Sequence, residues 1–237
     1  SWFAQMMEDG FQPSTIHRKS STLKSFFKFL MVNRFLEKSP MDLVPLPKLK
    51  KNLPKFVDEK SLNVLLNELE FPNNYEGKRD KLIMDLFYQT GIRQSELIEL
   101  TINDVDFSQQ QIKVLGKRNK ERIIPISSEL NETINEFVTY RKTDSVLNLI
   151  VTVSGKKIYP KLVYKIVNKY LSKVTTLSQR SPHVLRHSFA THMLNNGAEL
   201  NSIKELLGHV NLSATQVYTH NSMEKIKTIY KQAHPRA

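Results

Sequence analysis

Six residues, widely separated in the sequence, have side chains that together could bind and cleave a phosphodiester. They are two arginines, two histidines, a lysine and a tyrosine: Arg93, Lys117, His183, Arg186, His209 and Tyr218. Arginine can donate paired hydrogen bonds to phosphate oxygens, whereas histidine and lysine can transfer protons. A tyrosine hydroxyl can attack phosphorus and form a covalent intermediate that keeps the energy of the broken bond. Such a set requires no metal ion and implies no cofactor.

The elements that position these residues are predicted to be mostly helices. The first clear helix should begin after Pro13 with Ser14 as its N-cap, and Gly91 should end the helix that precedes Arg93. Apolar residues at helical spacing predict helices over residues 13–31, 58–70, 78–90, 94–100, 128–141, 159–173, 182–196, 200–207 and 223–232.

Three short segments have strand character instead: residues 104–107, 111–115 and 122–126. The polar, basic segment 116–120 between the last two predicts a turn, so Lys117 should lie at the tip or the edge of a hairpin. The predicted fold class is therefore mainly α with a small antiparallel β-sheet (α+β).

A proline-rich stretch between residues 40 and 54 interrupts the helical pattern and contains Lys48, Lys50 and Lys51. It predicts an extended basic linker. We accordingly divide the chain into a helical domain over residues 1–47, a linker over 48–57 and a larger domain over 58–237. The linker lysines serve either solubility alone or contact with a phosphate backbone.

The charge balance favours a polyanionic partner. The chain has 35 Lys and Arg against 23 Asp and Glu, a formal net charge of +12 and an isoelectric point near 9.7. It contains no cysteine, which excludes disulfides and thiol catalysis and fits the reducing cytoplasm. Its apolar stretches are far shorter than the roughly 20 residues of a membrane span, so we expect no membrane partner.

Five motifs contain the six residues and carry a resemblance. They are Thr-Gly-Ile-Arg-Gln-Ser-Glu-Leu at 90–97, Gly-Lys-Arg-Asn-Lys-Glu-Arg at 116–122, His-Val-Leu-Arg-His-Ser-Phe-Ala-Thr-His at 183–192, Leu-Gly-His at 207–209 and Thr-Gln-Val-Tyr-Thr-His at 215–220. The chain resembles the tyrosine recombinases, the integrase family that cuts and rejoins DNA through a 3′-phosphotyrosine, from about residue 10 to the end. Its closing His-Pro-Arg-Ala at 234–237 is similar to Xer-type bacterial recombinases, which resolve chromosome dimers.

The resemblance implies a role for each site residue. Arg93 and Arg186 would bind the scissile phosphate and stabilise its transition state, and Tyr218 would be the nucleophile. The residues with supporting roles match family positions as follows: His183 assists proton transfer at the nucleophile, His209 hydrogen-bonds the phosphate, Lys117 protonates the departing 5′-oxygen, and Glu96 orients the site. Arg118 stands where many relatives have glycine, which leaves Lys120 open as an alternative acid.

The resemblance also implies a partner and an assembly. Double-stranded DNA would be bound by four protomers, either identical or shared with a related recombinase, that act in alternating pairs. The basic residues expected to contact DNA are Arg18, Lys19, Lys24, Lys48, Lys50, Lys51, Arg118, Lys120 and Arg122. A Xer-type role would place the protein in chromosome partition and cell division, in the cytoplasm and at the nucleoid of a bacterium.

Several alternatives remain open in the sequence. A mobile-element integrase or transposase would share all of the chemistry, and a non-catalytic DNA-binding module would share the charge. A metal hydrolase built on His183, His187 and His192 is disfavoured, because no His-Glu-x-x-His motif accompanies them. Relatives have an amino-terminal DNA-binding domain of four or more helices, of which residues 1–50 supply about the second half. Residues 223–232 could dock on a neighbouring protomer or pack on their own domain.

Overall fold

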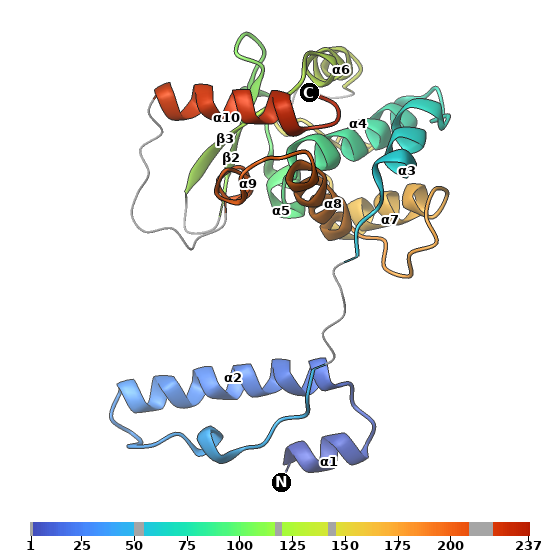
Figure 1. Cartoon of the computed structure of the whole chain (residues 1–237). Helices are drawn as coiled ribbons and strands as arrows, with labels where there is room; N and C mark the ends of the chain where they lie inside the picture. Colours follow the sequence, from blue (N-terminus) through green and yellow to red (C-terminus); the bar gives the residue numbers. More distant parts are fainter. Residues whose placement is uncertain (1, 50–54, 117–119, 142–145, 209–219) are drawn as a thin grey trace. The chain divides into compact units, whose positions relative to one another are not determined.

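The chain forms two compact units, Ser1–Leu53 and Pro54–Ala237 (Figure 1). A computed structural model describes all residues apart from 1, 50–54, 117–119, 142–145 and 209–219. The division between the units falls inside the predicted linker. Among the described residues, no helix is both long enough and apolar enough to cross a membrane.

The first unit is a pair of helices closed by a short turn. Helix α1 (Trp2–Glu8) packs against α2 (Pro13–Val32). Its small core contains Phe3, Met6, Ile16 and Met41. Pro13 opens α2, because its fixed φ suits the first helical position and its missing N–H would be unused there. The predicted N-cap Ser14 is wrong: it lies inside the first turn, and Gln12 occupies the cap without a side-chain hydrogen bond.

The stretch predicted as an extended linker begins instead with a 3-10 helix, η1 (Pro40–Leu43), which packs on α2. The Ser39 side chain caps this turn by accepting from the Met41 backbone N–H at 3.2 Å. Farther on, His17 Nε2 lies 2.7 Å from the Pro47 carbonyl oxygen. These contacts tie residues 39–47 to the first unit. The turn can form despite Pro40, because proline at the start of a turn removes no hydrogen bond that the turn needs.

The second unit is built around α4 (Tyr75–Thr90), whose side chains are almost all buried. Neighbouring helices α6, α7 and α8 pack against it, as Figure 1 shows. The other helical elements of this unit are α3 (Glu59–Asn63), the π-helical turn η2 (Val64–Glu68), α5 (Gln94–Glu99), η3 (Ile102–Asp104), α6 (Ser128–Thr139), α7 (Pro160–Leu171), α8 (Pro182–Asn195), α9 (Leu200–Leu207) and α10 (His220–Ala233). The helices predicted over 58–70, 78–90 and 94–100 correspond to α3 with η2, to α4 and to α5.

A small antiparallel sheet lies at one side of this unit, with strand order β1 (Val105–Asp106), β2 (Gln111–Leu115) and β3 (Glu121–Pro125). Its presence confirms the predicted fold class. Alternate residues of β2 and β3 face the core, including Ile112, Val114 and Ile124. Arg122 pairs directly with Val114 in the register and therefore points to the same buried face.

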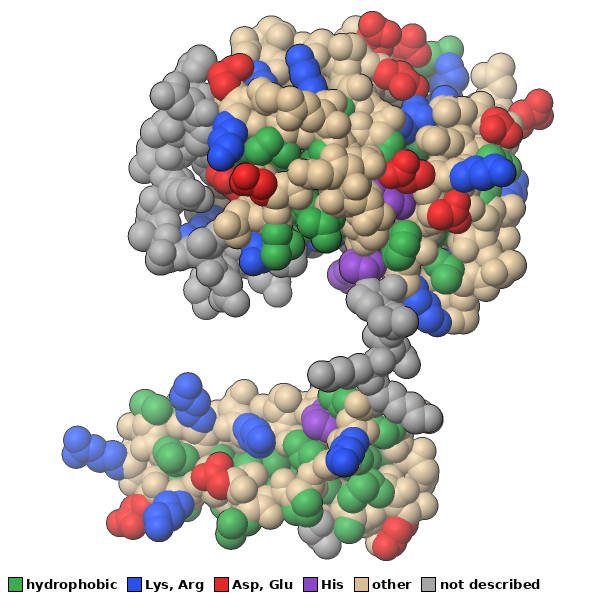
Figure 2. Space-filling view, viewed as in Figure 1, with side chains coloured by type: hydrophobic (Ala, Val, Ile, Leu, Met, Phe, Trp, Pro, Cys, Tyr) green, Lys and Arg blue, Asp and Glu red, His purple; other side chains and the backbone are tan. Residues whose placement is uncertain are grey.

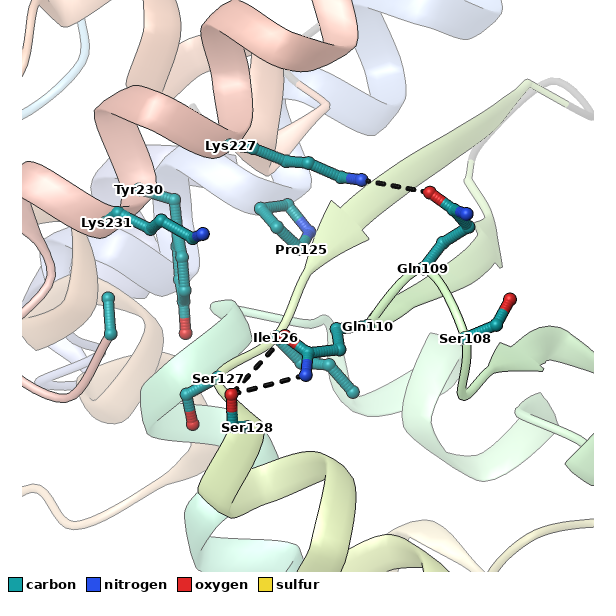
Figure 3. Close-up of a pocket in the computed structure, with 11 residues that line it drawn as sticks. Ser108, Gln109, Gln110, Pro125, Ile126, Ser127, Ser128, Lys227, Tyr230 and Lys231 are labelled. Carbon is teal, nitrogen blue, oxygen red and sulfur yellow. Dashed lines mark hydrogen bonds between the residues drawn. The ribbon is translucent and has the colours of Figure 1, made fainter.

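The C-terminal helix α10 packs on its own domain, which is one of the two arrangements expected from the sequence. Ile226 and Tyr230 are part of the main core, and the ring of His234 stacks on that of Tyr230 with centroids 5.0 Å apart. Figure 3 shows a pocket beside α10, across which Lys227 reaches to Gln109, with Nζ 3.5 Å from Oε1. The helix is thereby held against the turn between β1 and β2.

Candidate active site

The centre of the site is the carboxylate of Glu96, which is 2% exposed. Its Oε1 accepts hydrogen bonds from Nη1 of Arg93 and Nη1 of Arg122, both at 2.7 Å. Its Oε2 accepts from the backbone N–H of Arg93 and from Nη2 of Arg122, both at 2.8 Å. Each oxygen therefore has two donors, so the carboxylate is fully satisfied and held in one orientation.

The local sequence explains how Arg93 and Glu96 come together. Gly91 ends α4 in the left-handed conformation with φ of 58°, and Arg93 becomes the N-cap of α5. Glu96 is the third residue of α5, from where a glutamate can reach back to the N-cap N–H. Two features exclude a side chain at position 91. The positive φ disfavours any residue other than glycine, and a Cβ there would lie 2.7 Å from Phe189 and 2.8 Å from Leu207.

Three successive carbonyls at the C-terminal end of α9 each accept a hydrogen bond from a different arginine. The pairs are Arg122 Nε with Leu206 O at 2.7 Å, Arg186 Nη2 with Leu207 O at 2.6 Å, and Arg93 Nη2 with Gly208 O at 2.8 Å. The last carbonyls of a helix lack partners within the helix and carry its negative end, so cations stabilise them. Gly208 ends the helix in the left-handed conformation. The three arginines are thus tied to the end of α9.

Arg186 lies close enough to two other arginines for their charges to act on it. Its Nη1 donates to the Gly91 carbonyl, and its pKa falls to about 9, first because of burial and then because of the charges of Arg93 and Arg122. Three guanidinium charges against the one carboxylate of Glu96 leave an excess of two positive charges. An anion placed beside Arg93 and Arg186 would relieve this repulsion.

Glu96 is ionised throughout the physiological range. Burial alone would raise its pKa, but the hydrogen bonds and charge of Arg122, followed by the hydrogen bonds of Arg93, outweigh burial and lower the pKa to about 2. A group with such a pKa exchanges no proton near pH 7. Glu96 is therefore a fixed, charged acceptor for Arg93 and Arg122.

Of the other predicted site residues, His183 and Lys120 are described by the structure and are not part of this cluster. His183 is exposed on α8, one helical turn before Arg186. Lys120 is exposed just before β3, and its carbonyl accepts from the Gly116 N–H at 2.7 Å, which closes the base of the hairpin. The remaining residues of the prediction lie outside the described residues: Lys117, Arg118, His209 and Tyr218.

Predicted DNA contacts in the first unit are mostly exposed. Arg18, Lys24 and Lys48 are exposed, and the Nζ of Lys19 lies 5.3 Å from the centre of the Trp2 ring. Figure 2 shows that Lys and Arg side chains alternate with hydrophobic ones on this unit. Lys50 and Lys51 lie outside the described residues.

Arg122 requires a correction, because it was predicted to contact DNA and is 3% exposed. Its fork binds both oxygens of Glu96 and its Nε binds the Leu206 carbonyl, so its donors face the protein. The register of β3 turns it inward. Sequence reasoning missed its real place, although Arg122 and Ile124 share the period-two pattern of the buried face.

One histidine of the metal-hydrolase alternative, His192, has another partner. His192 is buried, and its Nδ1 lies 3.0 Å from the Tyr88 hydroxyl. Burial lowers the pKa of His192, so its neutral form is favoured. Within the described part of the chain, no group of three or more His, Asp or Glu side chains is placed to hold a metal ion.

Comparison with known proteins places these residues in a family context. The phage integrase family matches residues 55–225. Tyrosine recombinase XerC of Bacillus subtilis (strain 168) is 38% identical over 243 residues, which cover 100% of this chain and 80% of the relative. Tyrosine recombinase XerC of Chlorobaculum parvum (strain DSM 263 / NCIMB 8327) is 35% identical over 260 residues, which cover 100% of this chain and 77% of that relative.

Solved structures share the fold. XerA recombinase has a TM-score of 0.60 at 26% identity and covers 98% of this chain and 80% of its own. A second structure is that of XerH site-specific recombinase bound to palindromic difH substrate in a post-cleavage complex. It has a TM-score of 0.71 at 22% identity, and the match covers 93% of this chain and 67% of the XerH chain. The integrase of mycobacterium phage Brujita has a TM-score of 0.66 at 19% identity, and the match covers 99% of this chain and 77% of the integrase chain.

Proposed function

We propose that this chain, which belongs to the phage integrase family of tyrosine recombinases, uses Tyr218 to break and rejoin double-stranded DNA through a 3′-phosphotyrosine. The observation that carries the proposal is the arginine cluster, in which Arg93 and Arg186 keep an unneutralised charge beside an ordered carboxylate. Phosphoryl transfer depends mainly on positioning and on stabilising the charge of the phosphate oxygens.

The proposed reaction has two matched steps. The Tyr218 hydroxyl loses its proton, with His183 assisting, and its oxygen bonds to phosphorus while the bond from phosphorus to the 5′-oxygen breaks. Lys117 supplies a proton to the leaving 5′-oxygen. A 5′-hydroxyl from a partner strand then attacks the phosphotyrosine, which regenerates the tyrosine and joins the new strands. No ATP is needed, because the phosphodiester energy is retained in the covalent bond.

Arg93 and Arg186 would hold the phosphate during both steps. Each guanidinium has five N–H donors, and the protein acceptors described above take two from each arginine. The side chain of Arg93 is 23% exposed, so it can meet a ligand from solvent. His209 would add a further hydrogen bond to the same phosphate. Glu96 would keep Arg93 oriented without reacting.

The two units would divide the work. Residues 1–47 would be part of a DNA-binding domain that offers the exposed Arg18 and Lys24, residues 48–57 a basic linker, and residues 58–237 the catalytic domain. We further propose a Xer-type role in resolving chromosome dimers, in the cytoplasm at the bacterial nucleoid. The relatives named XerC, which match the chain over its full length, support this role over that of a mobile-element integrase.

We expect four protomers on two DNA sites, with α10 moving from its own domain to a neighbour. Sedimentation of the chain on DNA, with and without residues 223–237, tests this arrangement. Deletion should reduce the DNA-bound mass from four protomers toward one or two. An unchanged DNA-bound assembly would mean that α10 makes no essential contact between protomers.

The proposed chemistry is tested with a DNA substrate that carries a nick near the cleavage site. Cleavage then releases a short strand, and the covalent complex accumulates because rejoining loses its nucleophile. The parent chain should give a protein–DNA adduct that survives a denaturing gel, with the same yield in excess EDTA. If the parent forms no adduct on DNA that it binds, the proposal is wrong.

A further inference from the structure

A buried arginine on β3 stands behind the residues that would touch the phosphate. Arg122 contacts Glu96 and the Leu206 carbonyl through three short hydrogen bonds. With 4% of its side chain exposed, it is far less accessible than Arg93, which is 23% exposed. Arg122 therefore has no open face for a ligand, although it is linked to Arg93 by two hydrogen bonds to the shared Oε1 of Glu96.

Arg122 also carries an electrostatic cost that its position must offset. Its charge lowers the pKa of Arg186, after burial and the charge of Arg93, and so opposes the charge that would bind phosphate. A neutral residue of similar size would spare the protein that repulsion. The hydrogen bonds to Glu96 are the specific contribution that a neutral residue could not make, because only the guanidinium fork matches both carboxylate oxygens.

The same side chain also fixes the end of α9. Its Nε donates to Leu206, and a Cβ on Gly208 would crowd Arg122, 3.1 Å from its Cδ, in a backbone conformation (φ 64°) that already favours glycine. Arg93 and Arg186 bind the next two carbonyls of this helix end. Arg122 thus joins Glu96, which orients Arg93, to the helix end that both phosphate-facing arginines contact.

We propose that Arg122 is a positioning residue, which keeps Glu96 ionised and oriented so that Glu96 and the end of α9 present Arg93 and Arg186 to the scissile phosphate. This inference rests on the proposed function, because that function supplies the scissile phosphate. The effect of Arg122 on Glu96 does not depend on it. Without Arg122, burial would favour the protonated carboxyl, which offers fewer acceptor sites for Arg93.

The direct test is an NMR titration of the Glu96 side-chain carboxyl in the parent and in Arg122→Gln, with Glu96→Gln to assign the signal. Above pH about 4 the parent should show no titration, because the pKa of Glu96 is about 2. Removing the Arg122 charge raises that pKa, so the variant should titrate between pH about 4 and about 7. A Glu96 signal that stays flat in Arg122→Gln overturns the inference, whether or not the parent cleaves DNA.

Charged groups near Glu96 must be separated from Arg122. Besides Arg93 and Arg186, they are Glu99, Asp104, Lys113 and Glu121, which line a pocket beside Glu96. Arg79→Gln is the matched control, because Arg79 is equally buried at 3% and pairs with Asp80, outside the cluster. It should leave the Glu96 titration unchanged even if it lowers stability. A shift as large as that of Arg122→Gln would assign the effect to general loosening.

Cleavage of the nicked substrate gives the second readout. Below pH about 7, Arg122→Gln should lose on the order of 100-fold in single-turnover rate, since about 1 Å of misplacement can cost that much. The loss should deepen as pH falls through the raised Glu96 pKa. DNA affinity and its salt dependence should not change. A salt slope reduced by about one would instead make Arg122 a phosphate contact.

Arg122→Lys provides a variant that keeps the charge but not the fork, in case the glutamine variant does not fold. Lysine would hold Glu96 ionised, so its titration should stay flat, whereas cleavage should remain slower than in the parent because Leu206 and one carboxylate oxygen lose their donor. A lysine variant that cleaves at the parent rate would show that the fork geometry is not required.

Discussion

Tyr218→Phe will form no covalent adduct with nicked DNA, while it binds the same DNA as tightly as the parent. Phenylalanine keeps the ring but has no oxygen to attack phosphorus, so the loss should be about 10⁴-fold or more, the size seen when a nucleophile is removed. Because an unperturbed phenol has a pKa of about 10, the change removes no negative charge near neutral pH. The yield of adduct on a denaturing gel measures the effect.

The control for this result is DNA affinity, measured by titration at a fixed salt concentration. Binding within about 2-fold of the parent would show that the variant is folded and reaches its substrate, since phosphate contacts dominate affinity. An adduct of equal yield from Tyr218→Phe would move the nucleophile to another residue. Tyr230 is a poor substitute, because it is buried in the core and burial raises its pKa.

Lys117→Ala should slow cleavage of ordinary DNA by about 10²- to 10⁴-fold, the usual contribution of a general acid. A 5′-alkoxide is a poor leaving group without a proton, whereas a thiolate leaves readily, because thiols have a pKa near 8.5. A substrate with sulfur in place of the bridging 5′-oxygen should therefore restore the rate of Lys117→Ala. The ratio of the two rates, sulfur to oxygen, identifies the acid.

Lys120→Ala is the matched control, because Lys120 is a lysine of the same hairpin and is exposed before β3. It should change the ratio of sulfur to oxygen rates little and cleavage by less than about 10-fold. If the sulfur substrate rescues Lys120→Ala and not Lys117→Ala, the acid is Lys120. Rescue of neither variant would place the acid outside the hairpin.

The repeating patterns of the sequence predicted most helices and strands of the second unit. The spacing of apolar residues located α4 and α8, and their alternation along β2 matched its bounds. Burial of one face of a helix or strand produces such a regular pattern of apolar residues in the sequence. Gly91 and Gly208 were predicted to follow helices, and both have positive φ in the structure. Arg93, Glu96 and Arg186 were singled out by spacing and resemblance, and the structure brings them together around one carboxylate and one helix end.

What the sequence did not predict depends on three-dimensional partners. Arg122 was counted with the surface bases because charge alone does not distinguish an inward from an outward strand position. Its partner Glu96 lies 26 positions away, and its other acceptor, Leu206, lies 84 positions away. Ser14 was expected to cap α2, but Pro13 already satisfied the start of that helix. The stretch from residue 40 was predicted to be extended throughout, because the packing of η1 on α2 depends on residues distant in the sequence.

The end of α9 has a consequence for how the chain acquires its clamp during synthesis. The hydrogen bond from Arg93 to Gly208 joins residues 115 positions apart, and that from Arg186 to Gly91 joins residues 95 apart. Domains fold as units, and the N-terminal parts emerge first from the ribosome. A nascent chain that has not reached residue 208 has no Gly208 carbonyl for Arg93 to bind, so the arginine cluster is complete only once most of the second unit has been made. The contacts of Arg93, Arg122 and Arg186 with residues 206–208 therefore form late in synthesis.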